Sequence, residues 1–557
     1  MKSIYMKSML MIGVAATAMA AFGARTVTPS AQLADPLEWL YPDSQVGSVR
    51  TLEIVDVPAN GVLEANVLLN GLDPDKPLSF ACNVPAGEWF RYVAVAVPLN
   101  TGIDGATEKR GSTNNVYVTR LAPFWVYDAM EPVAGGSVKP GAATAALRFR
   151  LREFRGPGVQ NVKLAVSQGK FRKTFTLRVN VHSAKVPPVG RDSFKYTNWI
   201  DFHAIAICHG VKTWSEEHYK LIEDYIRLAV YGRQNMVRLP DFRKNYADSS
   251  PDCNEEAYIR LVALLMREGV WYLEGPHLCR YSAGNYMSPA FIPGGWSGTN
   301  LTTSIEGSAY LARRCQSLYA MIRKNGWADR WYQHVADEPN RFNAEEYRMT
   351  CGIVRKYMPG IRLADAVESP VTAGALDVFC PQNYRYEKSR AECERFRMCP
   401  TDEIWCYTCM FPGGRWLNRL LDQEVMRPVL MGWGCFCFGL EGYLHWGYNQ
   451  YRPKTDPLKL TLDSTEKMQE EDLPFGDRNI VYAGKSGPWP SVRLEAMRQG
   501  FEDVELLKLL ASRDKAKADT LTKKLVRGFH DYEMDPAVYR AVRHELLTAV
   551  DLLKNHP

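Results

Sequence analysis

The sequence predicts a multidomain protein of mixed β and α/β class, with an N-terminal β-sandwich, a (β/α)8 TIM-like barrel and a C-terminal helical tail. Three observations support this prediction. Early segments alternate apolar and polar residues between Gly-containing turns, later segments alternate strand-like and helical patterns, and a stiff Pro-rich stretch separates the two textures. At 557 residues, with 46% hydrophobic and 23% charged side chains, the chain has the length and composition of two or three globular domains.

Residues 1–24 are predicted to be a secretory signal peptide. Lys2 and Lys7 precede an apolar run over residues 9–24, which contains small residues near its end. A membrane anchor is the alternative, but the run is short for a spanning helix, and no Cys directly follows it, as a lipid-anchored bacterial precursor would require. No later segment has the uninterrupted apolar length of a spanning helix. We therefore expect a periplasmic or secreted protein with no membrane insertion after signal removal.

Residues 37–186 are predicted to form the β-sandwich. Segments 147–151, 162–166 and 175–181 largely alternate apolar with polar residues, as strands with one solvated face do. The stretch Val-Pro-Pro-Val-Gly over residues 186–190 ends this part of the chain. The sandwich carries no motif of its own, so bracing of the barrel is its expected role, with glycan binding or contact with another subunit as alternatives.

Residues 190–515 are predicted to form the barrel, and a Lys-rich helical tail follows over residues 516–557. Strand-like and helical segments take turns through roughly eight βα units. A doubly wound sheet fits less well because no glycine-rich dinucleotide fingerprint is present. Catalytic groups of such a barrel lie at the C-terminal ends of its strands and in the loops that follow. Strands are expected at residues 196–200, 235–239, 271–274, 332–336, 361–364, 377–379, 403–407 and 429–433.

The charge balance argues against a nucleic-acid-binding protein. Residues 1–25 hold three of the 68 basic residues and none of the 62 acidic ones, so the remaining chain has 65 basic and 62 acidic residues. The resulting net charge of +3 lacks the basic surface that nucleic-acid binding needs. We therefore expect no nucleic acid among the partners, and the sequence does not indicate an oligomeric state.

The cysteines do not predict a metal or a cofactor. Their number, thirteen, is odd and leaves at least one of them unpaired. Cys406 and Cys409 have the spacing of half a zinc or redox site, but they lie in an apolar strand pattern and a second Cys-x-x-Cys pair is absent from the sequence. Because a zinc site needs four converging ligands, we expect neither a metal nor a cofactor.

Asp337 and Glu338 follow an apolar strand and are the outstanding catalytic candidates. Most Asp-Glu pairs are solvated surface charge, but this pair lies where a barrel strand should end. Pro339 is expected to hold Glu338 in extended geometry. Neighbouring strand residues point to opposite sides, so the two carboxyls can serve two adjacent atoms but not a single one. Their repulsion raises the pKa of one carboxyl and keeps a general acid beside an anion, as glycoside hydrolysis requires.

A second group of candidates combines aromatic rings with polar side chains. Gly432-Trp433-Gly434 and the segment from Glu441 to Tyr451 are rich in both. Aromatic faces stack on the C–H faces of sugar rings, while amide, imidazole and phenol groups hydrogen-bond to sugar hydroxyls. Packing in the hydrophobic core is the alternative for each ring. The residues expected to bind substrate are His334, Tyr384, Tyr407, Trp433, His445, Trp446 and Asn449.

Three motifs occur in order along the chain: His334-Val-Ala-Asp-Glu-Pro339, Gly442-Tyr-Leu-His-Trp-Gly-Tyr-Asn449 and Ser491-Val-Arg-Leu-Glu-Ala-Met-Arg-Gln-Gly-Phe-Glu-Asp503. Together they resemble glycoside hydrolase family 123, over most of residues 190–515. That family consists of β-N-acetylgalactosaminidases with an N-terminal β-sandwich and a (β/α)8 barrel. The resemblance implies that Glu338 is the acid/base, and that Asp337 orients the 2-acetamido group of the substrate and stabilises the oxazolinium ion formed from it. In such substrate-assisted hydrolysis the acetamido oxygen attacks the anomeric carbon, so the enzyme supplies no nucleophile.

The function implied by the resemblance is removal of terminal β-linked N-acetylgalactosamine from glycans or glycolipids by an exported, retaining glycoside hydrolase. A different specificity, for β-N-acetylglucosamine or for internal cleavage, is the alternative, and His445 occupies a position where relatives carry Arg or His. A non-catalytic glycan-binding protein is a further alternative, although binding alone has no need for two neighbouring desolvated carboxylates. The charges of Arg493 and Glu495 lie on an amphipathic helix and are assigned to structural ion pairs, with contact to the substrate pocket as the alternative.

Overall fold

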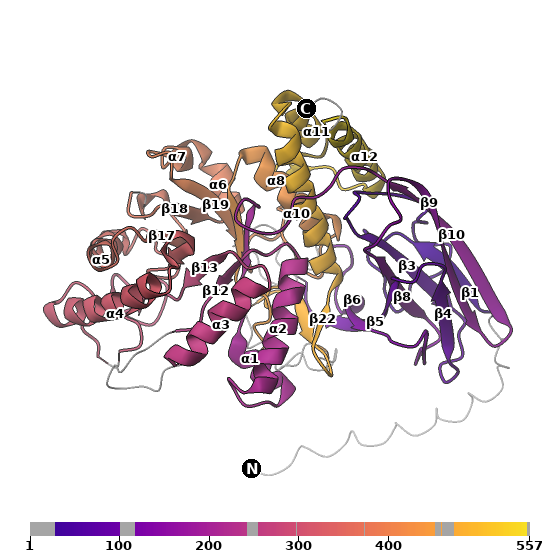
Figure 1. Ribbon diagram of the computed structural model, residues 1–557, viewed down its shortest axis with the longest axis horizontal. Coiled ribbons are helices and arrows are strands. Elements are labelled where there is room, and N and C mark those ends of the chain that lie inside the picture. The colour runs from indigo at the N-terminus through magenta and orange to yellow at the C-terminus, as the bar shows by residue number, and fades with distance from the viewer. Residues whose placement is uncertain are drawn as a thin grey trace, which may run out of the picture.

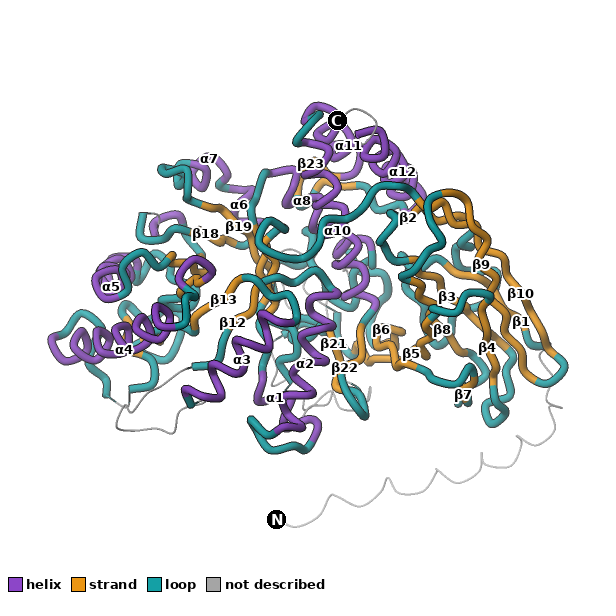
Figure 2. Tube along the Cα trace, viewed as in Figure 1, coloured by secondary structure: helices purple, strands orange, loops and turns teal. Residues whose placement is uncertain are grey.

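The computed structural model describes residues 28–100, 117–241, 254–296, 298–372, 374–451, 458 and 473–553. In these ranges the chain forms two packed β-sheets, a closed parallel barrel and a C-terminal group of helices (Figure 1). Figure 2 separates the strands of the sandwich from those of the barrel, which helices surround. The predicted fold class is thereby confirmed. The predicted signal peptide, residues 1–24, lies outside the described residues.

The N-terminal part is a sandwich of two five-stranded sheets. Side chains from both sheets form one hydrophobic core, in which Leu63, Leu147, Leu164 and Leu177 are buried. β1 begins ahead of residue 37, so the sandwich strands extend further toward the N-terminus than the alternation pattern indicates. The first sheet has the order β1 (Ser30–Ala34), β3 (Leu63–Asn70), β8 (Ala145–Leu151), β5 (Glu88–Val97) and β6 (Phe124–Pro132). The second has the order β2 (Ile54–Val57), β10 (Phe171–Val181), β9 (Gly158–Gln168), β4 (Leu78–Cys82) and β7 (Ser137–Val138).

Eight parallel strands form the barrel, which closes where β20 pairs with β11. Alternate residues of the strands pack together inside it, among them Tyr332, Trp405 and Leu444. Around the barrel the strands are β11 (Lys195–Asn198), β12 (Met236–Arg238), β13 (Tyr272–Gly275), β16 (Trp331–Gln333), β17 (Arg362–Val367), β18 (Val378–Pro381), β19 (Glu403–Thr408) and β20 (Gly442–His445). The first seven overlap the strands expected from the sequence.

The eighth strand is Gly442–His445, and the expectation of a strand at residues 429–433 is wrong. Those residues lie in helix α8 (Met426–Phe438), whose first ten residues are all buried. A helix that is apolar on all sides has no 3.6-residue period, so pattern alone does not distinguish a short run within it from a buried strand. In β20 the backbone of Gly442 lies against the indole ring of Trp405, where a Cβ atom would come within 2.5 Å of the ring.

Helices alternate with the barrel strands and cover the outside of the barrel (Figure 2). Ser215, Asn254 and Ser304 cap the helices α2, α3 and α4, because each side chain accepts a hydrogen bond from a backbone N–H of the first turn. The helices between the barrel strands include α1 (Phe202–His209), α2 (Glu216–Tyr231), α3 (Glu255–Arg267), α4 (Ile305–Lys324), α5 (Ala344–Tyr357), α6 (Asn383–Lys388) and α7 (Arg390–Glu394). Short elements between them are the hairpin β14 (Cys279–Tyr281) and β15 (Phe291–Pro293) and the 3-10 turns at Ala328–Arg330 and Pro370–Thr372.

The C-terminal helices join the barrel to the sandwich. Arg493 lies 2.9 Å from Asp128 of β6, and both side chains are fully buried. Two further buried pairs are Arg498 with Glu64 of β3 and Glu495 with Arg150 of β8, each at 2.9 Å. Breaking such a pair is costly because the remaining charge stays desolvated. The elements of this region are β21 (Val481–Ala483), β22 (Pro488–Pro490), α10 (Val492–Ala511), α11 (Lys515–Leu525), β23 (Val526–Gly528), β24 (Asp531–Tyr532) and α12 (Pro536–Leu553).

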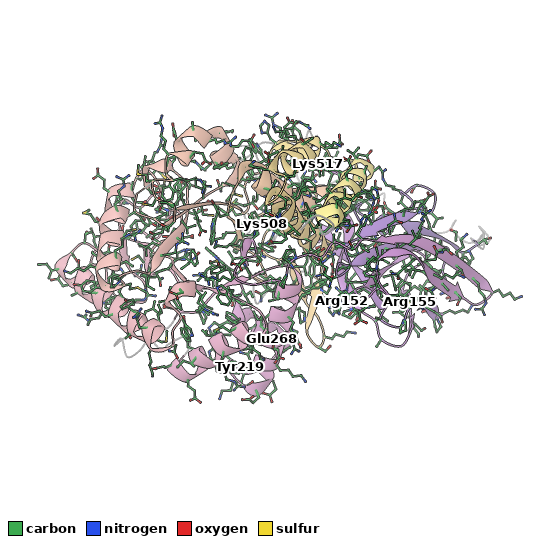
Figure 3. All side chains as sticks on the ribbon, turned by 45° about the horizontal axis from the view of Figure 1, so that its top comes forward. Arg152, Arg155, Tyr219, Glu268, Lys508 and Lys517 are labelled. Carbon is green, nitrogen blue, oxygen red and sulfur yellow. The ribbon has the colours of Figure 1, made fainter. Side chains whose placement is uncertain are left out.

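Charged side chains lie on all three parts of the molecule. In Figure 3, Glu268 lies on the barrel, Arg152 and Arg155 on the sandwich, and Lys508 and Lys517 on α10 and α11. Among the described residues, no helix is both long enough and apolar enough to cross a membrane.

Candidate active site

The carboxyls of Asp337 and Glu338 lie just beyond the C-terminal end of β16. The ladder of this strand ends at Gln333, and the chain then continues without regular structure through the pair. The side chain of Asp337 is 56% exposed, whereas Glu338 is half-buried. The hydroxyl of Tyr407, on β19, donates a hydrogen bond to Oε1 of Glu338 at 2.5 Å. The pair thus lies at the end of the barrel where catalytic groups of this fold are found.

The backbone at Glu338 turns into the left-handed region, with a φ of +41°. This corrects the extended geometry expected from Pro339. The hydroxyl of Tyr281 donates to the backbone carbonyls of Asp337, at 2.8 Å, and Glu338, at 3.2 Å, and these contacts hold the turn against the local preference. A non-glycine residue in this region is strained, and such strain is concentrated at functional sites. Because the turn interrupts the strand alternation, the two neighbouring carboxyls need not point to opposite sides.

The surroundings of Asp337 favour its protonated form. Burial among protein atoms, followed by the charge of Glu338, raises the pKa of Asp337 to about 7. The guanidinium of Arg238 opposes this shift, and solvent contact with the exposed carboxyl also limits the effect of burial. On one side of the carboxyl, Nε2 of His277 lies 3.7 Å from Oδ1.

Glu338 also holds its proton more tightly than an ordinary carboxyl. Burial raises the pKa of Glu338, while the hydrogen bond from Tyr407 and the charge of Arg385 act in the opposite direction. Because both pKa values move upward, the two carboxyls titrate as a coupled pair that retains a proton into the neutral range. The site can therefore present one acid and one carboxylate at the same time.

His334 lies beneath the pair and bridges two further carboxylates. Its Nδ1 is 2.9 Å from Oδ1 of Asp365, and its Nε2 is 2.9 Å from Oε2 of Glu274. Burial alone would lower the pKa of His334, but the hydrogen bonds to both carboxylates outweigh burial and raise it to about 9. His334 is 2% exposed and both of its ring nitrogens are engaged, and its expected contact with substrate stays a prediction. Its imidazolium supports the site from below.

His277 is a neutral neighbour of Asp337 that sequence reasoning missed. Nη2 of Arg238 lies 3.3 Å from Nδ1 of His277, which therefore accepts, and burial together with this guanidinium holds the pKa of His277 well below its usual value. The remaining proton is then on Nε2, which has no hydrogen-bond partner and lies nearest to Asp337. Glu274 ends the expected strand at residues 271–274 and His277 follows it closely, so a search of every strand end for polar residues would have found both.

Trp446 remains a candidate for contact with a sugar ring, whereas Tyr407 is 2% exposed and reaches the site through its hydroxyl. Both belong to the cluster of side chains that fills the barrel. Trp446 is partly exposed, its Nε1 donates to Oδ2 of Asp477 at 3.0 Å, and the guanidinium of Arg478 lies 5.6 Å from its ring centroid. Tyr384, on α6, is only 9% exposed and packs edge-on against Trp416 at a centroid distance of 5.9 Å.

Three residues expected to bind substrate are used by the fold instead. Trp433 is fully buried in α8 and its Nε1 donates to Oδ2 of Asp503 at 3.1 Å. Asn449 is fully buried, and its amide group donates to the carbonyl of Asp201 at 3.0 Å and accepts from its N–H at 2.8 Å. His445 is fully buried as well, and its Nδ1 accepts hydrogen bonds from Arg419, at 2.7 Å, and from the N–H of Gly447, at 3.0 Å. The sequence pattern identifies suitable residue types but not the direction in which each side chain points.

Polar groups from two more loops complete the end of the barrel. Arg385, on α6, pairs with Glu368, which follows β17, at 3.3 Å. The hydroxyl of Tyr286, in the loop after β14, donates to Glu368. Arg385 is 37% exposed and its charge also acts on Glu338. Paired groups of this kind can hydrogen-bond to sugar hydroxyls while they fix the positions of their neighbours.

The residues around the pair do not fit a metal ion. His277, His334 and Asp365 offer ligand atoms within 4.8 Å of one another. However, both nitrogens of His334 share protons with carboxylates, Asp365 also accepts from two backbone N–H groups, and the guanidinium of Arg238 lies against His277. A dication would have to displace these protons beside a fixed positive charge. The described cysteines are free thiols, and Cys406 is buried with its Sγ 3.7 Å from that of Cys435 on α8.

Comparisons with known proteins bear on this site. Residues 306–510 match the family model for the glycoside hydrolase 123 catalytic domain. The solved structure of a family 123 glycoside hydrolase from Clostridium perfringens, which describes glycolipid glycan hydrolysis, covers 95% of this chain and 98% of its own at a TM-score of 0.69 and 11% identity. At this identity, the structural match shows a shared fold. A family 39 glycoside hydrolase from Bacteroides cellulosilyticus WH2 has a TM-score of 0.37 at 10% identity, over 85% of this chain and 82% of its own, and carries no argument. No curated protein matches the chain.

The segment that the family model covers contains the two carboxyls of the candidate site, whereas Arg238, Glu274 and His277 precede it. It includes the Asp337–Glu338 pair, Tyr407 on β19 and Trp446 after β20, and it ends within α10. These residues come together at the C-terminal end of the barrel, where enzymes of this fold carry their catalytic groups. Residues 306–510 belong to the catalytic domain of glycoside hydrolase family 123.

Proposed function

We propose that this glycoside hydrolase is an exported β-N-acetylgalactosaminidase that removes terminal β-linked N-acetylgalactosamine with retention of configuration. The left-handed turn at Glu338 carries the proposal, because it allows two adjacent carboxyls to serve one sugar. One carboxyl of the pair is half-buried beside a hydroxyl donor and the other is open to solvent. Glycan binding alone does not require one half-buried and one exposed carboxyl side by side.

Glu338 acts as the general acid in the first step. The acetamido oxygen of the substrate attacks the anomeric carbon, the bond to the leaving oxygen breaks, and Glu338 gives its proton to that oxygen. Burial raises the pKa of Glu338 and so favours its acid form, whereas Tyr407 fixes the orientation of the carboxyl and stabilises the anion that remains. In the second step water attacks the same carbon, the bond from that carbon to the acetamido oxygen breaks, and the Glu338 carboxylate takes a proton from the water. The sugar is released with its original configuration because that carbon is displaced twice.

Asp337 serves the acetamido group. Its carboxylate accepts a hydrogen bond from the acetamido N–H, which orients the attacking oxygen, and it then stabilises the positive charge of the oxazolinium ion. The N–H of His277, 3.7 Å from Oδ1, and the charge of Arg238 help to keep this carboxyl ionised when substrate is bound. Under this proposal, binding of the sugar shifts the shared proton of the pair toward Glu338.

The proposed substrate is a glycan or glycolipid that ends in an N-acetylhexosamine. Support comes from the similar enzyme of Clostridium perfringens, whose structure describes glycolipid glycan hydrolysis. Trp446 offers a partly exposed ring for the face of the sugar, and Arg385 with Glu368 offers polar partners for hydroxyls. Export is supported by the signal-like residues 1–24, which would place the enzyme in the periplasm or outside the cell.

Release of p-nitrophenol from β-N-acetylgalactosaminide, β-N-acetylglucosaminide and β-galactoside conjugates tests this proposal. We expect kcat/KM to be highest for the first and the plain β-galactoside to be inert, because it lacks the assisting acetamido group. Preference for the β-N-acetylglucosaminide would establish the other exo-specificity. No release from any conjugate, together with measurable glycan binding, would replace the proposal with a glycan-binding function.

A further inference from the structure

A cluster of two histidines and a carboxylate lies where the sandwich meets the last helix, away from the Asp337–Glu338 pair. It joins Asp56 of β2, His182, which follows β10, and His544 of α12, which lies beside the sandwich in Figure 1. Nε2 of His182 and Nδ1 of His544 each lie 2.8 Å from Oδ1 of Asp56. All three ligand atoms lie within 4.8 Å of one another. The cluster therefore brings together residues that are distant in the sequence.

The two imidazoles converge on one oxygen atom. Their rings are nearly perpendicular, with a centroid distance of 5.5 Å and an interplanar angle of 71°. Oδ1 of Asp56 also accepts a hydrogen bond from Nδ2 of Asn180 at 3.2 Å. This single oxygen therefore contacts three nitrogen atoms, one from Asn180 and one from each histidine. Two imidazole nitrogens and one carboxylate oxygen are a donor set that zinc takes from His and Asp side chains.

A second carboxylate orients the buried histidine from behind. Nδ1 of His182 lies 2.9 Å from Oδ2 of Asp551. Oδ1 of Asp551 accepts from the hydroxyl of Ser183 at 2.9 Å and from the N–H of Ala184 at 2.5 Å. Metal-bound histidines commonly donate their other N–H to a carboxylate in this way, which fixes the ring and leaves the free nitrogen for the metal. Here the other nitrogen is Nε2, which faces Asp56, and a metal ion would displace the proton that Nε2 shares with that carboxylate.

We propose that Asp56, His182 and His544 form a site for a divalent transition-metal ion, with zinc as the best-suited ion and water as its fourth ligand. Imidazole and carboxylate donors suit zinc better than magnesium or calcium, which prefer oxygen ligands alone. Metal–ligand bonds of about 2.0–2.2 Å place tetrahedral ligand atoms about 3.3 Å apart, so each imidazole nitrogen, 2.8 Å from Oδ1 of Asp56, has to move away from that oxygen by only about half an ångström.

The charges around the cluster suit a dication. Asp56 and Asp551 supply two negative charges, and Arg543, which contacts the backbone carbonyl of Asp56 at 2.6 Å, has its own partner in Asp503. His544 is 53% exposed, so an ion reaches the cluster through solvent on that side. These two features distinguish the cluster from the one around His334, which is buried beside Arg238.

The ion would clamp α12 to the sandwich. α12 has other ties, because Arg540 pairs with Asp35 at 2.5 Å and Glu545 lies 3.9 Å from Lys517 of α11, which Figure 3 labels. A ligand that binds only the folded chain stabilises it in proportion to the logarithm of its concentration. Bound zinc is therefore expected to raise the melting temperature, and this expectation does not depend on which glycan the enzyme cleaves.

Metal analysis of the full chain after dialysis against zinc and gel filtration tests the site. We expect one zinc per chain, a melting temperature that rises with zinc and not with magnesium or calcium, and a Co²⁺ absorption spectrum of tetrahedral type. His544→Asn, at an exposed position that tolerates the change, should lose the bound zinc and the thermal shift. His209→Asn, on α1 and outside the cluster, should keep both.

Two results would overturn the site. One is wild-type protein that retains no zinc, and the other is zinc that remains bound in His544→Asn and Asp56→Asn alike. His182→Asn provides a third variant, with circular dichroism to confirm folding because this residue is buried. Metal content and melting temperature are read without any substrate, so failure of the glycosidase proposal would leave these results unaffected.

Discussion

The hydroxyl of Tyr407 lies 2.5 Å from Oε1 of Glu338 and links the end of β19 to the loop after β16. A donor at this distance stabilises the carboxylate more than the protonated acid, whereas burial of Glu338 does the reverse. The acidity of the proposed general acid is therefore set by two opposing contacts, one of which is removable by a single substitution.

Tyr407→Phe is expected to move the basic limb of the pH profile of kcat/KM to higher pH. The substitution removes the hydroxyl that lowers the pKa of Glu338, so the acid stays protonated at higher pH. The shift should be accompanied by a lower kcat, because the Glu338 carboxylate that forms on proton transfer loses the hydrogen bond from the Tyr407 hydroxyl. Tyr384→Phe, whose ring lies against Trp416 on α6, is the matched control and should leave the limb in place. A limb that stays fixed or moves to lower pH in Tyr407→Phe would exclude this role.

Trp446 and Trp433 should respond oppositely to replacement by Ala. Trp446 is partly exposed at the barrel end, so its loss should raise KM or lower kcat with little change in melting temperature. Trp433 is fully buried, and truncation of such a ring costs about 3–5 kcal/mol, while kcat/KM per folded molecule should stay unchanged. Kinetics and thermal melts of both variants check this. If Trp446→Ala lost as much stability as Trp433→Ala, Trp446 would belong to the core and not to the substrate site.

The stability of the protein should fall between pH 7 and pH 9 because of His334. Its pKa is about 9 in the folded chain against 6.5 as the ordinary value, so folding retains a proton that the unfolded chain releases. The stabilisation is complete below pH 6.5 and is lost as the pH rises through 9. Its slope reaches about 1.4 kcal/mol per pH unit. Urea unfolding across this range measures it, and His334→Asn should flatten the slope whereas His209→Asn should retain it. An unchanged slope in His334→Asn would assign the proton to another group.

Removal of metal should lower thermal stability without lowering turnover. The proposed mechanism moves protons through Asp337 and Glu338, and the proposed zinc ligands lie on β2, after β10 and on α12. Dialysis against chelator is therefore expected to reduce the melting temperature and to leave kcat at assay temperature unchanged. Added thiol or oxidant should also leave kcat unchanged, because Cys406 is buried in β19. Loss of kcat in folded protein, restored by a divalent ion, would show that metal takes part in catalysis.

Most of the barrel could be predicted from the sequence because its strands are short apolar runs between helices with acidic starts. Residues 429–433 mislead for a physical reason, since α8 is packed on all sides and has no polar face to reveal its period. β20 has only four residues, Gly442–His445, and its place in the barrel depends on pairing with strands at both ends of the barrel sequence. Such long-range pairing leaves no local pattern.

The catalytic pair could be predicted because both carboxyls lie in one motif at one strand end. The roles of His334, Glu274 and Asp365 could not be predicted, because they arise from contacts between different strands. Asn449 shows the reverse error. Its residue type suits a sugar hydroxyl, but its buried amide both donates to and accepts from the backbone of Asp201. Residue type and strand position therefore indicate chemistry, and only the packing decides which side chains remain free for it.

The two carboxyls should be separable by the leaving group of the substrate. Glu338→Gln is expected to slow hydrolysis of a natural glycoside by orders of magnitude, yet to spare the bond-breaking step for an aryl glycoside, whose phenolate departs with little protonation. Asp337→Asn should be slow with both substrates, because the acetamido group has to act whatever the leaving group is. Single-turnover rates with a p-nitrophenyl and a natural glycoside measure the difference.

The same mechanism demands that the acetamido group itself be indispensable. A thiazoline mimic of the cyclised intermediate should bind much more tightly than the product sugar, because it resembles the state that Asp337 stabilises, and Asp337→Asn should abolish this advantage. Glu338→Gln should still bind the thiazoline mimic more tightly than the product sugar, since the acid does not contact the cyclised group. Mass spectrometry of enzyme trapped during turnover should show no covalent adduct. A glycosyl group attached to Asp337, or efficient cleavage of the plain β-galactoside, would replace substrate assistance with a mechanism in which the enzyme supplies the nucleophile.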